Sequence, residues 1–439
     1  MARDPEADVL MTDVFLSRPR ARFRPWLLVA AFSLLLFLIT AATYSSLGVV
    51  IPAMVGELGW SWESAFAGFS ILGVFTGLSS WLPALLIRRI GARGVILVGV
   101  GVMAGGLACL ARVHALPIYF LGAALCGVGF QMAALIPGTH VLSAIFKARA
   151  LPFGIYFTFG ALGGVAGPWM VVKALAATQG DWRLYWALQA VAVGLVGVAC
   201  AVAVGGRRWL EQSGEALDRE LDAEAKVAHA SGVAASGVYH TDHEWSVRDA
   251  VRTPQFYVLV AAYFSHLLAG ISAASLTQAH LTQLGVAGIG GAAAAGALSL
   301  EGLMQVVARL GGGAIGDRVD PRWLLVFAQG LLVAGLLALA NATTPLLQVL
   351  YAVGVGVGFG LTVLAVSLLL LNYFGRRHNV ELFSLTCLVG AVSAAGPIIG
   401  GAARDRLGSF TPAFLVFAAI ASVVFVAALF MRPPRPKAT

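Results

Sequence analysis

The stretch GGGAIGDRVDPR, residues 311 to 322, joins two long apolar runs through a short turn rich in glycine and charge. A related stretch, LLIRRIGARG, occupies residues 85 to 94. Both place basic residues just beyond the predicted end of one helix and before the start of the next. They follow the second and the eighth apolar run, so they hold matching places in two halves of the chain. An internal repeat of this kind is typical of secondary transporters.

The composition is that of a membrane protein. The 439 residues have a mean hydropathy of +0.86 and only 11% are charged, whereas soluble chains carry about 25% charged residues. Apolar runs of about 20 residues recur along the sequence, which predicts a polytopic α-helical fold. The alternating segments of about 10 residues that build an outer-membrane barrel are absent.

We predict an all-α membrane protein with twelve transmembrane helices in two pseudo-symmetric halves of six. The predicted spans are 26–54, 63–87, 94–112, 116–142, 150–176, 184–204, 254–283, 286–315, 322–340, 345–371, 381–403 and 410–431. The predicted domains are an N-terminal tail (1–25), a six-helix bundle (26–204), a polar linker (205–253), a second bundle (254–431) and a C-terminal tail (432–439).

The distribution of positive charge predicts the orientation. Of the 29 Lys and Arg, 23 lie in the two tails and the even-numbered connections, one is Arg309 within a span, and five lie at the opposite helix ends. Those five are Arg112, Lys173, Arg183, Arg404 and Arg406. By the positive-inside rule, both tails and the linker are cytoplasmic. The net charge of +8 is therefore explained by topology, and we expect no nucleic-acid partner.

Several site classes find no support in the sequence. The four cysteines fall inside apolar segments at no metal-ligand spacing, so neither a metal site nor a disulfide framework is predicted. There is no phosphate-binding loop and no Gly-x-Ser-x-Gly motif. We therefore expect no catalytic residues, no enzymatic activity and no cofactor.

The two short stretches resemble the loop motif of the major facilitator superfamily, in which Gly, three residues, Asp, Arg, any residue and Gly precede basic residues. The matching positions are Gly313, Asp317, Arg318 and Arg322 in one copy and Arg89, Gly91 and Arg93 in the other. Two positions depart from the pattern, because Asp320 replaces the usual glycine and Arg88 replaces the usual aspartate. The missing aspartate implies that the first half latches differently or less firmly.

A second resemblance is to the bacterial relatives of the monocarboxylate transporters and oxalate–formate exchangers. It rests on IFKARALPFGIYFTFGALGG (145–164), with Phe146, Arg149, Leu151, Gly154 and Gly163 at matching positions, and on GPIIGGAARDRLGSF (396–410). The acidic-Gly-Gly start of the first helix is replaced here by TAATYSSLGVVIP (40–52). The resemblance implies a bacterial inner (plasma) membrane protein that transports a small organic anion.

The eighth span carries the principal candidate residues, Glu301, Gln305 and Arg309. Their spacing of four residues puts them on one helical face. Glu301 and Arg309 are about 12 Å apart along the axis, too far for a direct salt bridge. Because charged groups in the bilayer cost about 2.5–3.5 kcal/mol each, such residues face a cavity or a partner. The resemblance implies that Arg309 binds the substrate carboxylate; an ion pair between helices is the alternative role.

Other polar residues lie on spans that line the cavity in this superfamily. The further candidates for substrate binding are Thr40, Tyr44, Gln131, His266 and Ser367. His266 titrates near neutrality in water, so it joins Glu301 as a candidate for the coupling proton. Each of these residues could instead only bridge helices.

The sequence thus predicts a monomeric secondary transporter in the lipid bilayer that moves a small organic anion, a monocarboxylate, together with a proton. Two alternatives remain open. A proton-driven exporter of organic cations would use Glu301 without Arg309, although Ala123 stands where drug antiporters carry an arginine. A transporter-like sensor would bind a ligand and signal through residues 205–253.

Overall fold

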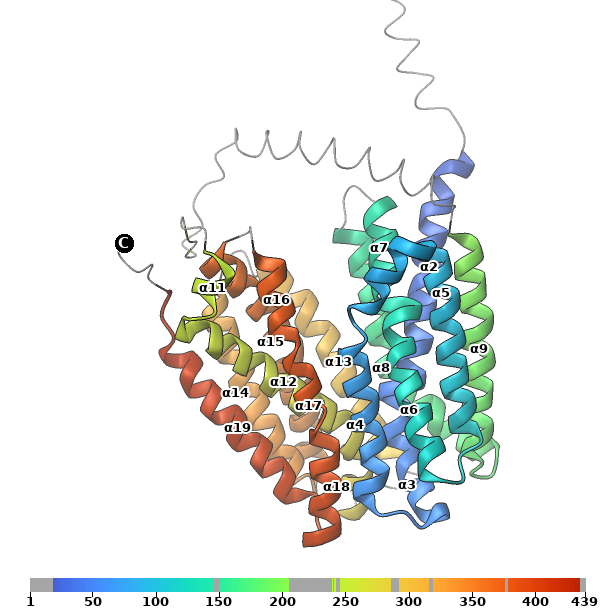
Figure 1. The fold of residues 1–439 in the computed structure, drawn as a ribbon. Helices are drawn as coiled ribbons and strands as arrows, with labels where there is room; N and C mark the ends of the chain where they lie inside the picture. Colours follow the sequence, from blue (N-terminus) through green and yellow to red (C-terminus); the bar gives the residue numbers. More distant parts are fainter. Residues whose placement is uncertain are drawn as a thin grey trace, which may run out of the picture.

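Residues 19–145, 150–204, 239, 241, 245–285, 292–315, 319–375 and 378–434 are described in the computed structural model, and every regular element among them is a helix. The helices form two bundles that stand side by side, coloured blue to green and yellow to red in Figure 1. We call the bundles the N-half and the C-half. The all-helical two-bundle architecture confirms the predicted fold class.

The N-half contains six crossings. They are α2 (Pro19–Thr40), η1 (Ala41–Ser45) and α3 (Ser46–Leu58); α4 (Trp62–Leu78); α5 (Leu82–Ala111); α6 (Leu116–Phe130), η2 (Gln131–Leu135) and α7 (Ile136–Ile145); α8 (Ala150–Ala177); and α9 (Trp182–Ala203). The elements η1 and η2 are single π-helical turns inside the first and fourth crossings. Such turns interrupt the regular helix and are frequent at functional sites.

The C-half follows the short helix α11 (Val247–Ala250). Its elements are α12 (Pro254–Gln283), α13 (Ala292–Ile315), α14 (Pro321–Ala340), α15 (Pro345–Phe374), α16 (Asn379–Cys387), α17 (Val389–Ser393), α18 (Gly396–Leu407) and α19 (Thr411–Phe430). The helices α16, α17 and α18 together form the eleventh crossing.

Three C-half helices begin with the same dipeptide pattern, a capping residue followed by proline. Thr253, Asp320 and Thr344 cap α12, α14 and α15, and each accepts a hydrogen bond from a backbone N–H of the first turn. Proline is favoured in the first turn because its missing N–H would have no intrahelical partner there. The capping role of Asp320 gives a structural reason for an aspartate where the loop motif usually has glycine.

Two predicted spans are broken where continuous helices were expected. The second span is interrupted by a turn at 79–81, and the eleventh is divided near Leu388 and Ala394. Pro83 and Pro397 follow the breaks by a few residues, and a proline removes a helical hydrogen bond and clashes with the preceding turn. The second crossing therefore continues into the first part of α5. It ends at Gly91, whose φ of 74° breaks the helix before the third crossing.

Ten helical segments are long and apolar enough to cross a bilayer by length and composition. The shorter α4 and the more polar α13 complete twelve. Large apolar side chains are exposed on the outer helices, which suits a surface covered by lipid. Examples are Leu188, Leu195 and Val202 on α9, Leu346 on α15, and Val423 and Phe430 on α19.

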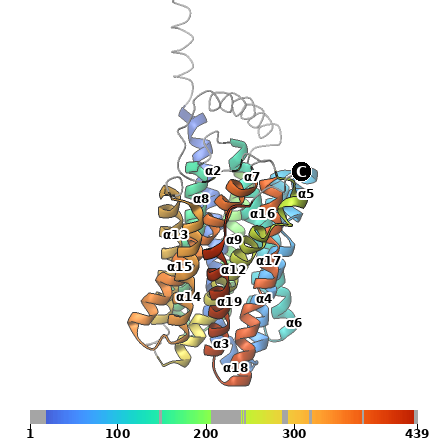
Figure 2. The ribbon, with the colours of Figure 1, turned by 90° about the vertical axis from the view of Figure 1, so that its left-hand side faces the viewer.

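The two halves meet closely at one end of the molecule. Figures 1 and 2 place the start of α2 at one end, the terminal side, and α3 and α18 at the other, the far side. On the far side, the Asp405 carboxylate of α18 accepts hydrogen bonds from the backbone N–H groups of Trp62 (3.1 Å) and Glu63 (2.7 Å) at the start of α4. Arg406 adds an ion pair with Glu63 at 3.6 Å. Towards the terminal side, the two bundles spread apart in Figure 1.

Candidate functional site

A cavity of about 350 Å³ lies between the two halves. Both halves contribute to its wall, the N-half through α2, η1, α6, η2 and α8 and the C-half through α12, α13 and α15. Its volume is within the range of small-molecule sites, about 300–1,000 Å³. Most lining residues are apolar or glycine, and the polar ones are Thr40, Tyr44, Ser45, Glu301, Gln305 and Arg309.

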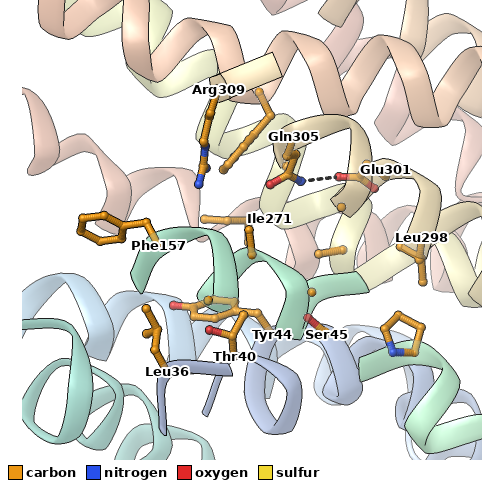
Figure 3. A pocket seen from close by; sticks show the side chains of 18 of the residues that line it. Leu36, Thr40, Tyr44, Ser45, Phe157, Ile271, Leu298, Glu301, Gln305 and Arg309 are labelled. Carbon is orange, nitrogen blue, oxygen red and sulfur yellow. Dashed lines mark hydrogen bonds between the residues drawn. The ribbon is translucent and has the colours of Figure 1, made fainter. Parts of the chain in front are cut away.

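Helix α13 supplies the charged side of the cavity. Glu301, Gln305 and Arg309 all line it, as their common helical face predicts. Figure 3 shows the three side chains in order along the helix, with Arg309 reaching into the space opposite Phe157 and Ile271. Among the described residues that line it, Arg309 is the only cation and Glu301 the only acid.

The guanidinium of Arg309 is unpaired within the described residues. The side chain is half-buried, its Nε has no hydrogen-bond partner, and none of the described carboxylates forms an ion pair with it. Its Cζ atom lies 5.8 Å from the ring centre of Phe359. Arg309 therefore lines the cavity and forms no ion pair with another helix among the described residues.

Glu301 is only 3% exposed, and its carboxyl group is held by neutral donors. Gln305 Nε2 donates to Oε1 at 3.2 Å, and the Tyr351 hydroxyl donates to Oε2. Thr277 in turn donates to the Tyr351 oxygen at 3.2 Å. No described cation pairs with this carboxyl, so a negative charge here would be compensated by hydrogen bonds alone.

The opposite wall comes from the N-half. Thr40 ends α2, and Tyr44 lies in the π-helical turn η1. The Tyr44 hydroxyl donates to Thr76 Oγ1 at 2.8 Å, and its ring packs edge-on against Phe69 and Phe130. The residues described on this side of the cavity therefore offer hydroxyl groups and hydrocarbon, and none of them is charged.

Helices α8 and α2, which both line the cavity, pack closely against each other. A Cβ atom on Gly163 would lie 2.4 Å from the Phe37 carbonyl oxygen, and one on Gly160 would lie 2.6 Å from Leu36 Cδ2. At Gly163 the neighbour is backbone, so a residue with a Cβ atom would force the two helices apart, whereas at Gly160 the neighbour is a side chain. Gly160 and Gly163 thus have a packing role beside the site.

Three predicted binding residues do not line the cavity. Gln131 is buried and its Nε2 donates to the Thr76 carbonyl at 3.1 Å. Ser367 donates to the Val363 carbonyl at 2.8 Å, within its own helix. His266 is fully buried between the rings of Tyr263 and Phe359, at centroid distances of 4.6 and 4.9 Å. The structure therefore brings Thr40, Tyr44, Glu301, Gln305 and Arg309 together, without these three.

The loop motif is only partly described. Arg89 and Arg93 are exposed on either side of Gly91, at the turn between the second and third crossings. Gly313 lies in the last turns of α13. Arg149, Asp317 and Arg318 lie outside the described residues.

Sequence reasoning missed Tyr351, which donates to Glu301 from α15, and Thr277, which donates to Tyr351 from α12. Both are fully buried. In the sequence, Tyr351 lies near the start of the tenth span, where a tyrosine is expected at the membrane interface. Only the helix packing reveals its partner.

Comparison with known proteins identifies the family. The model of the Major Facilitator Superfamily matches residues 33–395. No curated protein matches the sequence. Many solved structures share the fold.

Three of these structures illustrate the likeness. A mutant of the nucleoside transporter NupG has a TM-score of 0.69 at 15% identity, over 92% of this chain and 99% of that chain. A POT family transporter in complex with 5-aminolevulinic acid gives 0.68 at 14%, over 94% and 96%. The peptide transporter POT in complex with sulfate gives 0.68 at 17%, over 92% and 93%. At these identities the likeness concerns the fold. With the family match over most of its length, the chain belongs to the Major Facilitator Superfamily of membrane transporters.

Proposed function

We propose that this protein is a secondary active transporter that moves a small monocarboxylate together with a proton. The observation that carries the proposal is the unpaired Arg309 guanidinium in the cavity between the halves. A guanidinium stays charged when it is desolvated, and its planar donors match a carboxylate in two parallel hydrogen bonds. An arginine facing a cavity without an acidic partner is placed to receive an anion from solution.

The charge of the lining favours a substrate with one carboxylate. Among the described lining residues Arg309 is the single cation, so the cavity can neutralise one carboxylate and a second would remain uncompensated. The remaining wall is dominated by hydrocarbon, including Leu36, Phe157 and Ile271. We infer that the carboxylate lies on Arg309 and that an apolar body lies against this wall.

Glu301 is the proposed proton site. Burial in apolar surroundings disfavours an ionised carboxyl, so a proton bound there lowers the cost of moving the cavity through the membrane. When Glu301 is protonated and a carboxylate sits on Arg309, the cavity carries no net charge. A proton and an anion would then travel together as a neutral load.

The arrangement of the halves supports alternating access. The far side is joined by the contacts of Asp405 with the start of α4, whereas the bundles diverge towards the terminal side. Rocking one bundle against the other around the cavity would expose the site to each side in turn. We propose that the terminal side is cytoplasmic, in the inner membrane of a bacterium, and that residues 205–253 link the two halves.

The motif resemblance points the same way. The stretches 145–164 and 396–410 resemble the monocarboxylate and oxalate–formate branch, and Arg309 with Gly313 matches the pattern in which that branch binds its carboxylate. Export of an organic cation is the second candidate, because Glu301 is an acid that lines the cavity. Both of its oxygens already accept hydrogen bonds, which leaves it less available to a cationic substrate.

Counterflow in proteoliposomes tests the proposal. Vesicles loaded with an unlabelled monocarboxylate should take up the same monocarboxylate in labelled form. Vesicles loaded with an organic cation should not take up the labelled cation. Net uptake should rise when an inward proton gradient is imposed. Exchange of cations, or monocarboxylate uptake that is indifferent to the proton gradient, would contradict the proposal. Saturable binding without counterflow would instead support a ligand sensor.

A further inference from the structure

The buried carboxyl of Glu301 is fastened to two other helices of the C-half through a short series of hydroxyl groups. Thr277 of α12 donates to Tyr351 of α15 at 3.2 Å, and Tyr351 donates to Glu301 Oε2. All three residues are almost completely buried, with exposed fractions of 0% for Thr277 and Tyr351 and 3% for Glu301. The series leads away from the cavity into the protein.

The helices that carry this series are held in contact at the same level. A Cβ atom on Gly356 of α15 would lie 2.5 Å from the Glu301 carbonyl oxygen, and one on Gly360 would lie 2.7 Å from the Gln305 carbonyl oxygen. These glycines let α15 approach the backbone of α13 beside Glu301 and Gln305. The position of the Tyr351 hydroxyl relative to Glu301 is therefore fixed by backbone packing as well as by the hydrogen bond.

A hydroxyl series of this kind can satisfy the carboxyl in both of its protonation states. With Glu301 ionised, the donors point from Thr277 to Tyr351 to the carboxylate, as the structure has them. With Glu301 protonated, its O–H can donate to Tyr351 and each hydroxyl can rotate to donate in the opposite direction. The carboxyl of Glu301 therefore keeps its hydrogen bond to Tyr351 in either protonation state.

We propose that Tyr351, supported by Thr277, is the positioning residue that lets Glu301 gain and lose a proton while it remains buried. This inference rests on the proposed role of Glu301 in proton coupling. Tyr351 acts through Glu301 and does not line the cavity, so it has no expected contact with the substrate.

The other groups that face Glu301 do not replace Tyr351. Arg309 lies two turns along the same helix, and Tyr44 lies across the cavity with its hydroxyl donated to Thr76. The cavity-lining residues of α8 and α12 bear no titratable group. The neutral amide of Gln305 is the only other hydrogen-bond partner of this carboxyl among the described residues.

The test is the pH dependence of proton-driven uptake in a Tyr351→Phe variant. Removing the hydroxyl takes a donor from the ionised carboxylate, so Glu301 should keep its proton to a higher pH. Because a hydrogen bond to a charged group contributes about 1.5 kcal/mol, the pH of half-maximal uptake should rise by about one unit. Thr277→Val should shift it in the same direction by less.

Tyr119→Phe is the matched control, because it removes another buried tyrosine hydroxyl whose hydrogen bond, to the Ala65 carbonyl at 2.6 Å, lies in the N-half away from the cavity. Its pH profile should match the parent protein. An unchanged profile for Tyr351→Phe, or an equal shift for Tyr119→Phe, would overturn the inference.

Glu301→Gln separates this inference from the proposed function. It should abolish the pH dependence of uptake and the accumulation driven by a proton gradient. Counterflow should fall less than accumulation, because it needs no net proton movement. Adding Tyr351→Phe to it should then cause no further shift. If Glu301→Gln still accumulates substrate in response to a proton gradient, the proposed proton site itself is wrong. If Glu301→Gln fails to accumulate and Tyr351→Phe behaves as the parent, only the role of Tyr351 is wrong.

Discussion

An Asp405→Ala substitution should weaken the contact between the two halves on the far side. The first N–H groups of any helix lack intrahelical partners. At the start of α4, Ser61 accepts from the Ser64 N–H at 3.1 Å, and Asp405 of the other half accepts from Trp62 and Glu63. The cap of α4 is therefore completed only while the halves are joined.

The expected magnitude follows from these contacts. Losing a capping side chain costs about 1 kcal/mol, and losing a negative charge near a helix N-terminus costs about 0.3–1 kcal/mol. Together they give about 1.5 kcal/mol, or roughly a tenfold rise in the ratio of separated to joined far sides. Because Asp405 contacts α4 only when the halves are joined, its loss destabilises the joined state and the effect falls on this equilibrium.

The assay is a distance measurement between spin labels on the two halves. Ala115, between α5 and α6, and Thr343, between α14 and α15, are exposed on the far side and can be replaced by cysteine after the four native cysteines are removed. Asp405→Ala should increase the population with the longer label separation.

Asp181→Ala is the matched control for this experiment. Asp181 also accepts two backbone N–H bonds, from Arg183 (2.9 Å) and Leu184 (3.3 Å), but it caps α9 within the N-half. It should lower thermal stability without changing the inter-half distance. A distribution that Asp405→Ala leaves unchanged, or that Asp181→Ala shifts as much, would refute the reasoning.

Two further predictions concern the contact between the halves on the far side and the cavity. Gly401→Val should also favour the separated far side in the same label experiment, because even a Cβ atom there would lie 2.6 Å from the Trp62 carbonyl oxygen. A population equal to the parent's would contradict this prediction and show that the joined state accommodates the larger side chain. In competition for counterflow, the affinity of straight-chain monocarboxylates should rise about fourfold for each added CH₂ until the cavity is full, since each buried CH₂ contributes about 0.8 kcal/mol. Equal affinity along the series, or a preference for dicarboxylates, would contradict an apolar wall opposite a single cation.

The main features of the fold and of one cavity wall could be predicted from the sequence. Apolar runs determine the crossings because the bilayer fixes their length. The helical period places Glu301, Gln305 and Arg309 on one face whatever their surroundings, and the cost of burying charge in lipid turns that face towards a cavity. The breaks at 79–81 and near Ala394 depend on how prolines are accommodated, which composition alone does not determine.

Residues on other helices were less predictable, because their exposure depends on how each helix is rotated about its axis. On α12, the cavity is lined by Leu267, Gly270, Ile271 and Ala274, so His266, one position earlier, faces the interior of the C-half instead. The hydrogen bond from Tyr351 to Glu301 joins residues 50 positions apart. The spacing of residues within one helix cannot predict such a contact between two helices.

Equilibrium binding of a monocarboxylate to the parent protein and to Arg309→Gln tests the central claim most directly. Losing one partner of a buried charge pair costs about 2–5 kcal/mol, so the affinity should fall by about 30-fold or more. Arg112→Gln, which removes an exposed arginine at the end of α5, should bind as the parent does. Undiminished binding by a folded Arg309→Gln variant would contradict the assignment of this arginine to the substrate site.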